Sequence, residues 1–109
     1  MAYDQSLAER IRELMLGESG LSERNMFGGL AFMLDGHMLC GIVGDELMLR
    51  LGADGAERAL ERAHVRPMDI TGRPMTGMVF VAPEGLRGGA LDRWVGEAAA
   101  FVRTLPPKR

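Results

Sequence analysis

Two short turn sequences constrain the middle of this chain most strongly, because each joins two apolar segments. Asp35-Gly36 and Gly44-Asp45 are dipeptides typical of two-residue turns between antiparallel strands. The segment from Arg24 to Leu51 therefore has the pattern of three strands connected by tight hairpins. We expect it to form a three-stranded antiparallel meander.

The same turn lengths predict the pairing register, and the register decides which side chains share a face. The predicted cross-strand pairs are Leu34 with His37, Met33 with Met38, Ala31 with Cys40, Ile42 with Leu47, and Cys40 with Leu49. One face is then wholly apolar and is predicted to be the core face, with Phe27, Ala31, Met33, Met38, Cys40, Ile42, Leu47, Leu49 and Leu51.

The opposite predicted face is apolar as well, except at His37 and Arg50. A sheet with one solvated face alternates apolar and polar residues, so this face must be covered by something. A symmetric homodimer is the simplest cover. The alternative is that residues 66–77 or a short helix of the same chain covers it. The predicted interface consists of Met26, Leu30, Phe32, Leu34, Leu39, Val43 and Met48.

Apolar periodicity predicts three helices around these strands. The first covers Asp4 to Leu16, with Ser6 and Glu9 as a capping box or Asp4 as the cap. A short helix covers Asp54 to Ala63, and a long one runs from about Gly89 to about Leu105.

Between the last two helices, Met78 to Val81 reads as a strand. Pro67 and Pro74 restrict any strand in the preceding segment to an edge or a bulge. The order of elements predicts an α+β fold. We expect an antiparallel sheet of four to five strands with an N-terminal, a short middle and a long C-terminal helix, in one domain over residues 1–109.

Composition excludes several classes of protein. The 109 residues include 13 basic and 15 acidic ones, and the net charge of −2 argues against nucleic-acid binding by bulk electrostatics. The single cysteine cannot form an intramolecular disulfide or a multi-cysteine zinc site. The first residues do not resemble a signal peptide, and no apolar run is long enough to span a membrane. We therefore expect a cytoplasmic protein without membrane contact.

No residue pattern predicts an enzyme, and we expect neither a cofactor nor a metal. His37 and Cys40 are three residues apart on one predicted strand, so they should point to opposite faces and form no dyad. Cys40 is predicted to be a buried, unreactive thiol. Phe27-Gly28-Gly29-Leu30 lacks the frame of a phosphate loop, and its glycines suggest a bulge or a close backbone approach.

Three arginines are candidates for binding an anion or an acidic partner. Arg50, Arg66 and Arg73 lie on or beside predicted strands, and the last two precede prolines that restrict their backbone. The alternative interpretation is ordinary surface charge, with internal pairing to Asp69 or Glu84.

Several motifs resemble the N-terminal domain of the TfoX/Sxy family of competence regulators. They are Met26-Phe27-Gly28-Gly29-Leu30-Ala31-Phe32-Met33, the run from Gly36 to Val43, Arg66-Pro67-Met68-Asp69, Thr71-Gly72-Arg73-Pro74-Met75 and Leu105-Pro106-Pro107-Lys108. The resemblance covers essentially the whole chain. It implies an α+β domain linked to bacterial transcription regulation, acting with a cyclic-AMP receptor protein. Two-domain members continue into a helical domain, whereas this sequence ends at Arg109, so the resemblance implies a single-domain member.

The leading hypothesis is a non-enzymatic regulatory or adaptor domain that acts through contact with a protein partner. The alternative is a small anion- or metabolite-binding domain that uses Arg50, Arg66 and Arg73.

Overall fold

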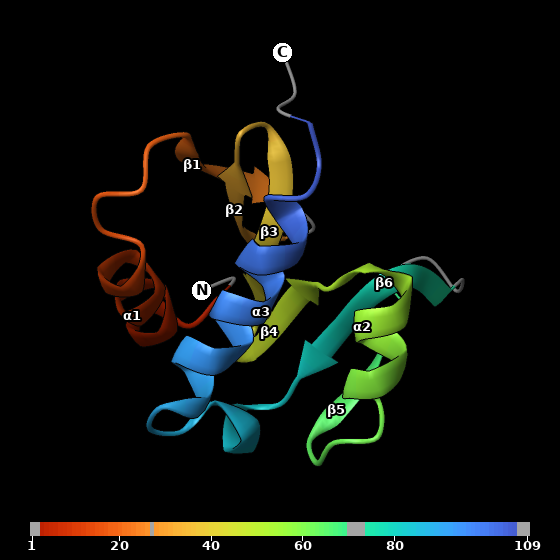
Figure 1. Cartoon of the computed structure of the whole chain (residues 1–109). Coiled ribbons are helices and arrows are strands. Elements are labelled where there is room, and N and C mark those ends of the chain that lie inside the picture. Colours follow the sequence, from red (N-terminus) through yellow and green to blue (C-terminus); the bar gives the residue numbers. More distant parts are fainter. Residues whose placement is uncertain (1–2, 27, 70–73, 107–109) are drawn as a thin grey trace.

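Six antiparallel strands form one sheet in the order β1-β2-β3-β4-β6-β5 within the described part of the chain (Figure 1). The computed structural model describes residues 3–26, 28–69 and 74–106. The strands are β1 Leu21–Met26, β2 Gly29–Leu34, β3 His37–Val43, β4 Glu46–Arg50, β5 Val65–Asp69 and β6 Pro74–Val81. The helices are α1 Gln5–Leu14, α2 Gly52–Ala59 and α3 Ala90–Val102, with a 3-10 turn at Pro83–Leu86.

This architecture confirms the predicted α+β fold and the order of its helices, but the sheet has six strands instead of four or five. The segment before Leu34 forms two strands, because Gly28 has a φ of +73° between β1 and β2. The opening meander therefore has four strands, β1 to β4. The strand that contains Pro67 lies at a sheet edge and carries a bulge, as its proline predicts.

A bulge in β3 changes the predicted register. The pairs Leu34–His37 and Met33–Met38 are confirmed, as are Ile42–Leu47 and Cys40–Leu49. The predicted Ala31–Cys40 pair is wrong: Cys40 pairs with Phe32, and Ala31 pairs with Gly41. Leu39 is the extra residue, since it lies unpaired between Met38 and Cys40. The turn sequences could not reveal it, because it lies away from both turns.

The bulge also changes which side chains face the helices. Leu30, Phe32, Leu34 and Leu39 were predicted to form an interface, but they are buried in the main core. They pack there with Cys40, Ile42, Leu47, Leu49, Val79 and Val81 and with apolar residues of all three helices. Conversely, Ala31, Met33 and Met38 were predicted on the core face and lie on the other face. Phe27 lies outside the described residues.

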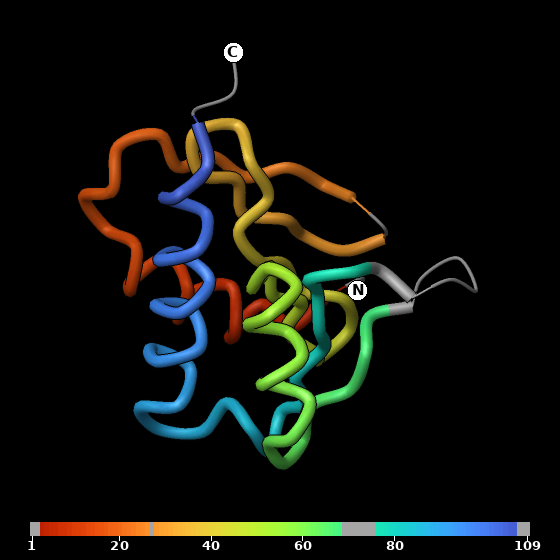
Figure 2. Tube along the Cα trace, turned by 45° about the vertical axis from the view of Figure 1, so that its right-hand side comes forward, coloured from red at the N-terminus to blue at the C-terminus, as the bar shows by residue number. Residues whose placement is uncertain are grey.

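The helices cover only one face of the sheet. Ala56 and Ala59 of α2 and Trp94 and Ala98 of α3 belong to the same core cluster as Leu49. Figure 2 shows α2 and α3 side by side, and in Figure 1 they lie in front of the strands. None of the helices in the described residues is long and apolar enough to cross a membrane. In the described part of the chain, the apolar cluster on the second face contains strand residues and no helix residue.

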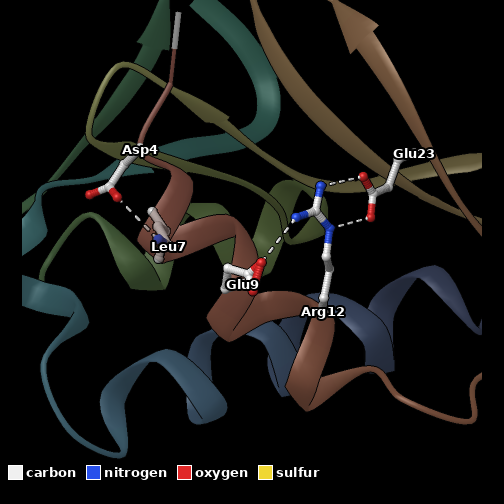
Figure 3. Close-up of polar contacts among 5 residues, drawn as sticks. All are labelled: Asp4, Leu7, Glu9, Arg12 and Glu23. Carbon is white, nitrogen blue, oxygen red and sulfur yellow. Dashed lines mark hydrogen bonds and ion pairs between the residues drawn. The ribbon is translucent and has the colours of Figure 1, made fainter. Parts of the chain in front are cut away.

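The N-terminal helix starts at its predicted alternative cap. The Leu7 N–H donates a hydrogen bond to Asp4 Oδ1 at 3.1 Å, so Asp4 caps α1 and the Ser6–Glu9 capping box does not (Figure 3). In contrast, α2 begins at Gly52, two residues before the predicted cap Asp54, and no side chain caps it.

An ion pair fastens α1 to the first strand. Arg12 donates to both carboxylate oxygens of Glu23, at 2.7 and 2.8 Å (Figure 3). Its Nη1 atom also lies 3.9 Å from Oε1 of Glu9. These hydrogen bonds lower the pKa of the Glu23 carboxyl. Because Glu23 faces α1, the alternation along β1 places Arg24 on the opposite face.

Candidate interaction surface

The sheet face opposite the helices carries one continuous row of opposed residues across all six strands. The row runs through Arg24, Ala31, Gly41, Met48, Phe80 and Arg66. Directly opposed residues in antiparallel strands point to the same face. An arginine therefore lies on each edge strand, and the residues between the two arginines are small or apolar.

Methionines dominate the rest of this face. The sequence has nine methionines, and six of those that the structure describes lie on it: Met26, Met33, Met38, Met48, Met68 and Met78. We call this surface the methionine face. It comprises these six residues with Arg24, Ala31, Gly41, Val43, Glu46, Arg50, Arg66 and Phe80.

Burial divides the methionine face into a closed part and an open part. Met48, Met68, Met78 and Phe80 form a second apolar cluster, and all four lie on strands. Met38 and Val43 pack against that cluster and are only half-buried, as is Met26. The half-buried side chains form the part of the face that a partner could still contact.

Arg66 covers the closed part. Its guanidinium lies 4.5 Å from the centre of the Phe80 ring and donates to both Glu46 oxygens, at 3.1 and 2.5 Å. The sequence suggested Asp69 or Glu84 as internal partners, and in the structure Glu46 is a partner of Arg66. Arg66 on β5 and Glu46 on β4 form this ion pair across the intervening strand β6. The Phe80 ring of β6 therefore packs against the guanidinium of Arg66, whose charge is neutralised by Glu46.

The structure brings two of the three predicted arginines to this one face. Arg50 lies on β4 opposite Met78 and is half-buried. It makes no hydrogen bond or ion pair in the described part of the chain, unlike Arg66. Arg73 lies outside the described residues. Sequence reasoning missed Arg24, which lies on β1 opposite Ala31 and joins Arg50 on this face.

Of the predicted interface residues, the structure keeps three on the methionine face. Met26 and Val43 are half-buried there, and Met48 is buried beneath its neighbours. The other four lie in the main core, as described above. The methionines are the sequence signal that could have identified this face, since their positions fit the alternation of side chains along the strands once the bulge at Leu39 is included.

His37 and Cys40 share a face, contrary to the prediction, because the bulge lies between them. They are opposite Leu34 and Phe32, and both face the helices. His37 Nε2 donates to the Pro106 carbonyl oxygen at 2.6 Å, whereas Cys40 is fully buried in the core. Burial raises the pKa of the Cys40 thiol to about 12, which confirms the prediction of a buried thiol.

A cleft of about 520 Å³ lies between α2 and α3, on the helix side. It contains the uncapped first turn of α2 together with Arg58, but also the carboxylates of Asp54 and Glu97. Glu97 is paired with Arg62 at 2.9 Å. The charged residues that line this cleft are therefore of mixed sign. In the described part of the chain, no group of three or more His, Cys, Asp or Glu side chains could hold a metal ion.

The family of the chain follows from a comparison of its sequence with family models. Residues 13–102 match the model of the TfoX N-terminal domain. The match contains the whole sheet, α2 and α3, and therefore every residue of the methionine face. Neither a curated protein nor a solved structure matches the chain. Since most of its length fits this one model, the chain belongs to the TfoX N-terminal domain family.

Proposed function

We propose that this chain is a non-enzymatic regulatory domain of the cytoplasm that acts by binding a protein partner through the methionine face. The observation that carries the proposal is the exposed part of that face. Met26, Met38 and Val43 are half-buried beside the closed cluster, to which no helix of the described residues contributes.

The residue types on this face suit protein contact. Methionine side chains are unbranched and polarisable, so they adapt to the shape of a partner. Methionine and arginine are enriched at the centres of protein interfaces, whereas lysine and glutamate are depleted. The described charged residues of the face are three arginines and Glu46. The family resemblance suggests that the partner belongs to the machinery of transcription regulation.

A second candidate function is the binding of a small anion or metabolite by the arginines. Arg50 favours it, because this half-buried cation has no partner among the described residues. Arg66 opposes it, because its guanidinium is already held by Glu46, and an anion would have to displace that carboxylate. The protein partner is therefore the better-supported function.

Affinity capture from cell extract tests the proposal when it includes matched variants. Met38→Glu places a charge on the open part of the methionine face. Leu60→Glu places the same charge at the end of α2, where Leu60 is 40% exposed on the helix side. We expect wild type and Leu60→Glu to capture the same protein and Met38→Glu to lose it, with unchanged circular dichroism.

Capture that survives Met38→Glu would refute the methionine face as the contact surface. A thermal-shift screen with phosphate, nucleotides and carboxylates distinguishes the second function. Saturable stabilisation that disappears in Arg50→Ala, without a captured protein, would favour anion binding instead.

A further inference from the structure

We infer that the partner presents an acidic segment to the methionine face, with apolar side chains between its carboxylates. This inference rests on the proposed function and adds the chemistry of the partner. The whole chain has a net charge of −2. The described charges of the methionine face sum to the opposite sign, because they comprise the cations Arg24, Arg50 and Arg66 and the anion Glu46.

Two of these cations are available to a partner. Arg24 is exposed on the edge strand β1, and Arg50 is half-buried on β4. Neither makes an ion pair or a side-chain hydrogen bond in the described part of the chain. Three strand spacings separate their strands, which is about 14 Å along the sheet. Two carboxylates of one segment could therefore reach both guanidinium groups at once.

The surface between these two cations is apolar. Ala31 and Gly41 lie in the same row as Arg24, and Met33 and Met38 lie beside them. Met48 extends over Gly41, since a Cβ on Gly41 would lie only 2.5 Å from Met48 Cε. The centre of the face thus offers methionine side chains above small residues, which suits apolar anchors between the two carboxylates.

The position of Arg50 makes a carboxylate necessary. Arg50 lies opposite Met78, which belongs to the apolar cluster that Met38 packs against, so a partner that covers this cluster also removes water from the already half-buried Arg50. Burying a cation without a counter-charge is costly, and a bidentate carboxylate is the group that offsets this cost best. A neutral or basic segment would leave the cation uncompensated. Nucleic acid supplies anions but no apolar anchors for the methionines, so a protein segment fits the face better.

Selection from a displayed library of random peptides tests the inference. Peptides of about 12 residues can span the two arginines in either extended or helical form. We expect the enriched peptides to carry two or more Asp or Glu residues around apolar ones. Fluorescence anisotropy of the most enriched peptide should show that Arg50→Glu weakens its binding about tenfold or more, and Arg24→Glu less.

Arg58→Glu is the matched control, because Arg58 is exposed on α2 on the helix side. This control should leave the affinity unchanged, and added salt should weaken binding to wild type. Failure to enrich any peptide, enrichment of basic or neutral peptides, or equal binding to Arg50→Glu would overturn the inference. Competition by duplex DNA, or self-association of the chain that Arg50→Glu abolishes, would identify a different occupant and overturn it as well.

The two proposals fail in different ways. If Met38→Glu abolishes protein capture while Arg24→Glu and Arg50→Glu do not affect it, the methionine face remains the contact surface and only its preference for acidic partners is wrong. If capture is equally strong for Met38→Glu, the contact surface itself is wrong.

Discussion

Leu39 is the residue on which the chemistry of both sheet faces depends. It lies unpaired in β3 and is fully buried in the main core. Because it interrupts the strict alternation, Met38 contributes to the methionine face while both Leu39 and Cys40 face the helices. This one extra residue therefore reverses the predicted faces of His37 and Met38 and of the β2 residues that pair with β3.

Glutamate substitutions on the two faces should have opposite consequences for folding. Phe32 is 0% exposed beneath the helices, so Phe32→Glu buries a charge without a partner and should abolish cooperative thermal unfolding. Val43 is half-buried on the methionine face, so Val43→Glu should remain folded with a modest loss of Tm. Circular dichroism melts compare the two variants. A folded Phe32→Glu with the melting temperature of wild type would contradict the observed register.

Cys40 should make the protein less stable at alkaline pH. Burial raises the pKa of this thiol from 9.0 to about 12, so between these pH values the unfolded chain loses a proton that the folded chain keeps. The stabilisation is complete below pH 9 and is lost as the pH rises towards 12. The free energy of unfolding should fall by up to about 1.4 kcal/mol per pH unit in this range.

Cys40→Ala isolates that effect. The variant should lose about 1–2 kcal/mol at neutral pH as a small core truncation, but it should lack the thiol's share of the alkaline decline. Urea unfolding of both proteins across the range measures the difference. Rapid alkylation of native Cys40 by iodoacetamide, at the rate of the unfolded chain, would show that the thiol is not buried.

At the scale of elements, close contacts between strands decide how far the sheet can be altered. A Cβ on Gly29 would lie 2.0 Å from the carbonyl oxygen of Ile42 in the neighbouring strand. A Cβ on Gly41 would lie 2.5 Å from the methyl end of Met48, which can move, and 3.0 Å from the Leu30 carbonyl oxygen. The glycine of β2 therefore meets rigid backbone, whereas the glycine of β3 first meets a flexible side chain.

Alanine substitutions at these glycines should differ in cost. Overpacking of a well-packed site costs about 1–3 kcal/mol, and we expect Gly29→Ala at or above the upper end because two strands must separate. Gly41→Ala should fall nearer the lower end, because Met48 can change its rotamer. Denaturant unfolding measures both. Equal costs, or a larger cost for Gly41→Ala, would mean that the β2–β3 contact is looser than described.

At the scale of the whole molecule, local patterns predicted the elements well and their long-range consequences less well. The Asp35-Gly36 turn, the Pro67 edge strand and the order of helices all follow from local chemistry. Which residues share a sheet face does not follow from local chemistry, because Leu39 shifts the alternation at a position that carries no turn signal. The candidate surface was predicted only in part: Arg50 and Arg66 share a face, and Arg24, which the sequence analysis did not consider, lies on that face as well.

The central claim is that the methionine face binds a protein partner, and site-specific photo-crosslinking in cells tests it most directly. A photo-reactive amino acid replaces Met38 on the open part of that face, and in a parallel variant it replaces Leu60 on the helix side. The account predicts a protein cross-linked from Met38 and not from Leu60, at reduced yield when Arg50→Glu is added. Cross-links from Leu60 alone, or from neither position, would contradict it.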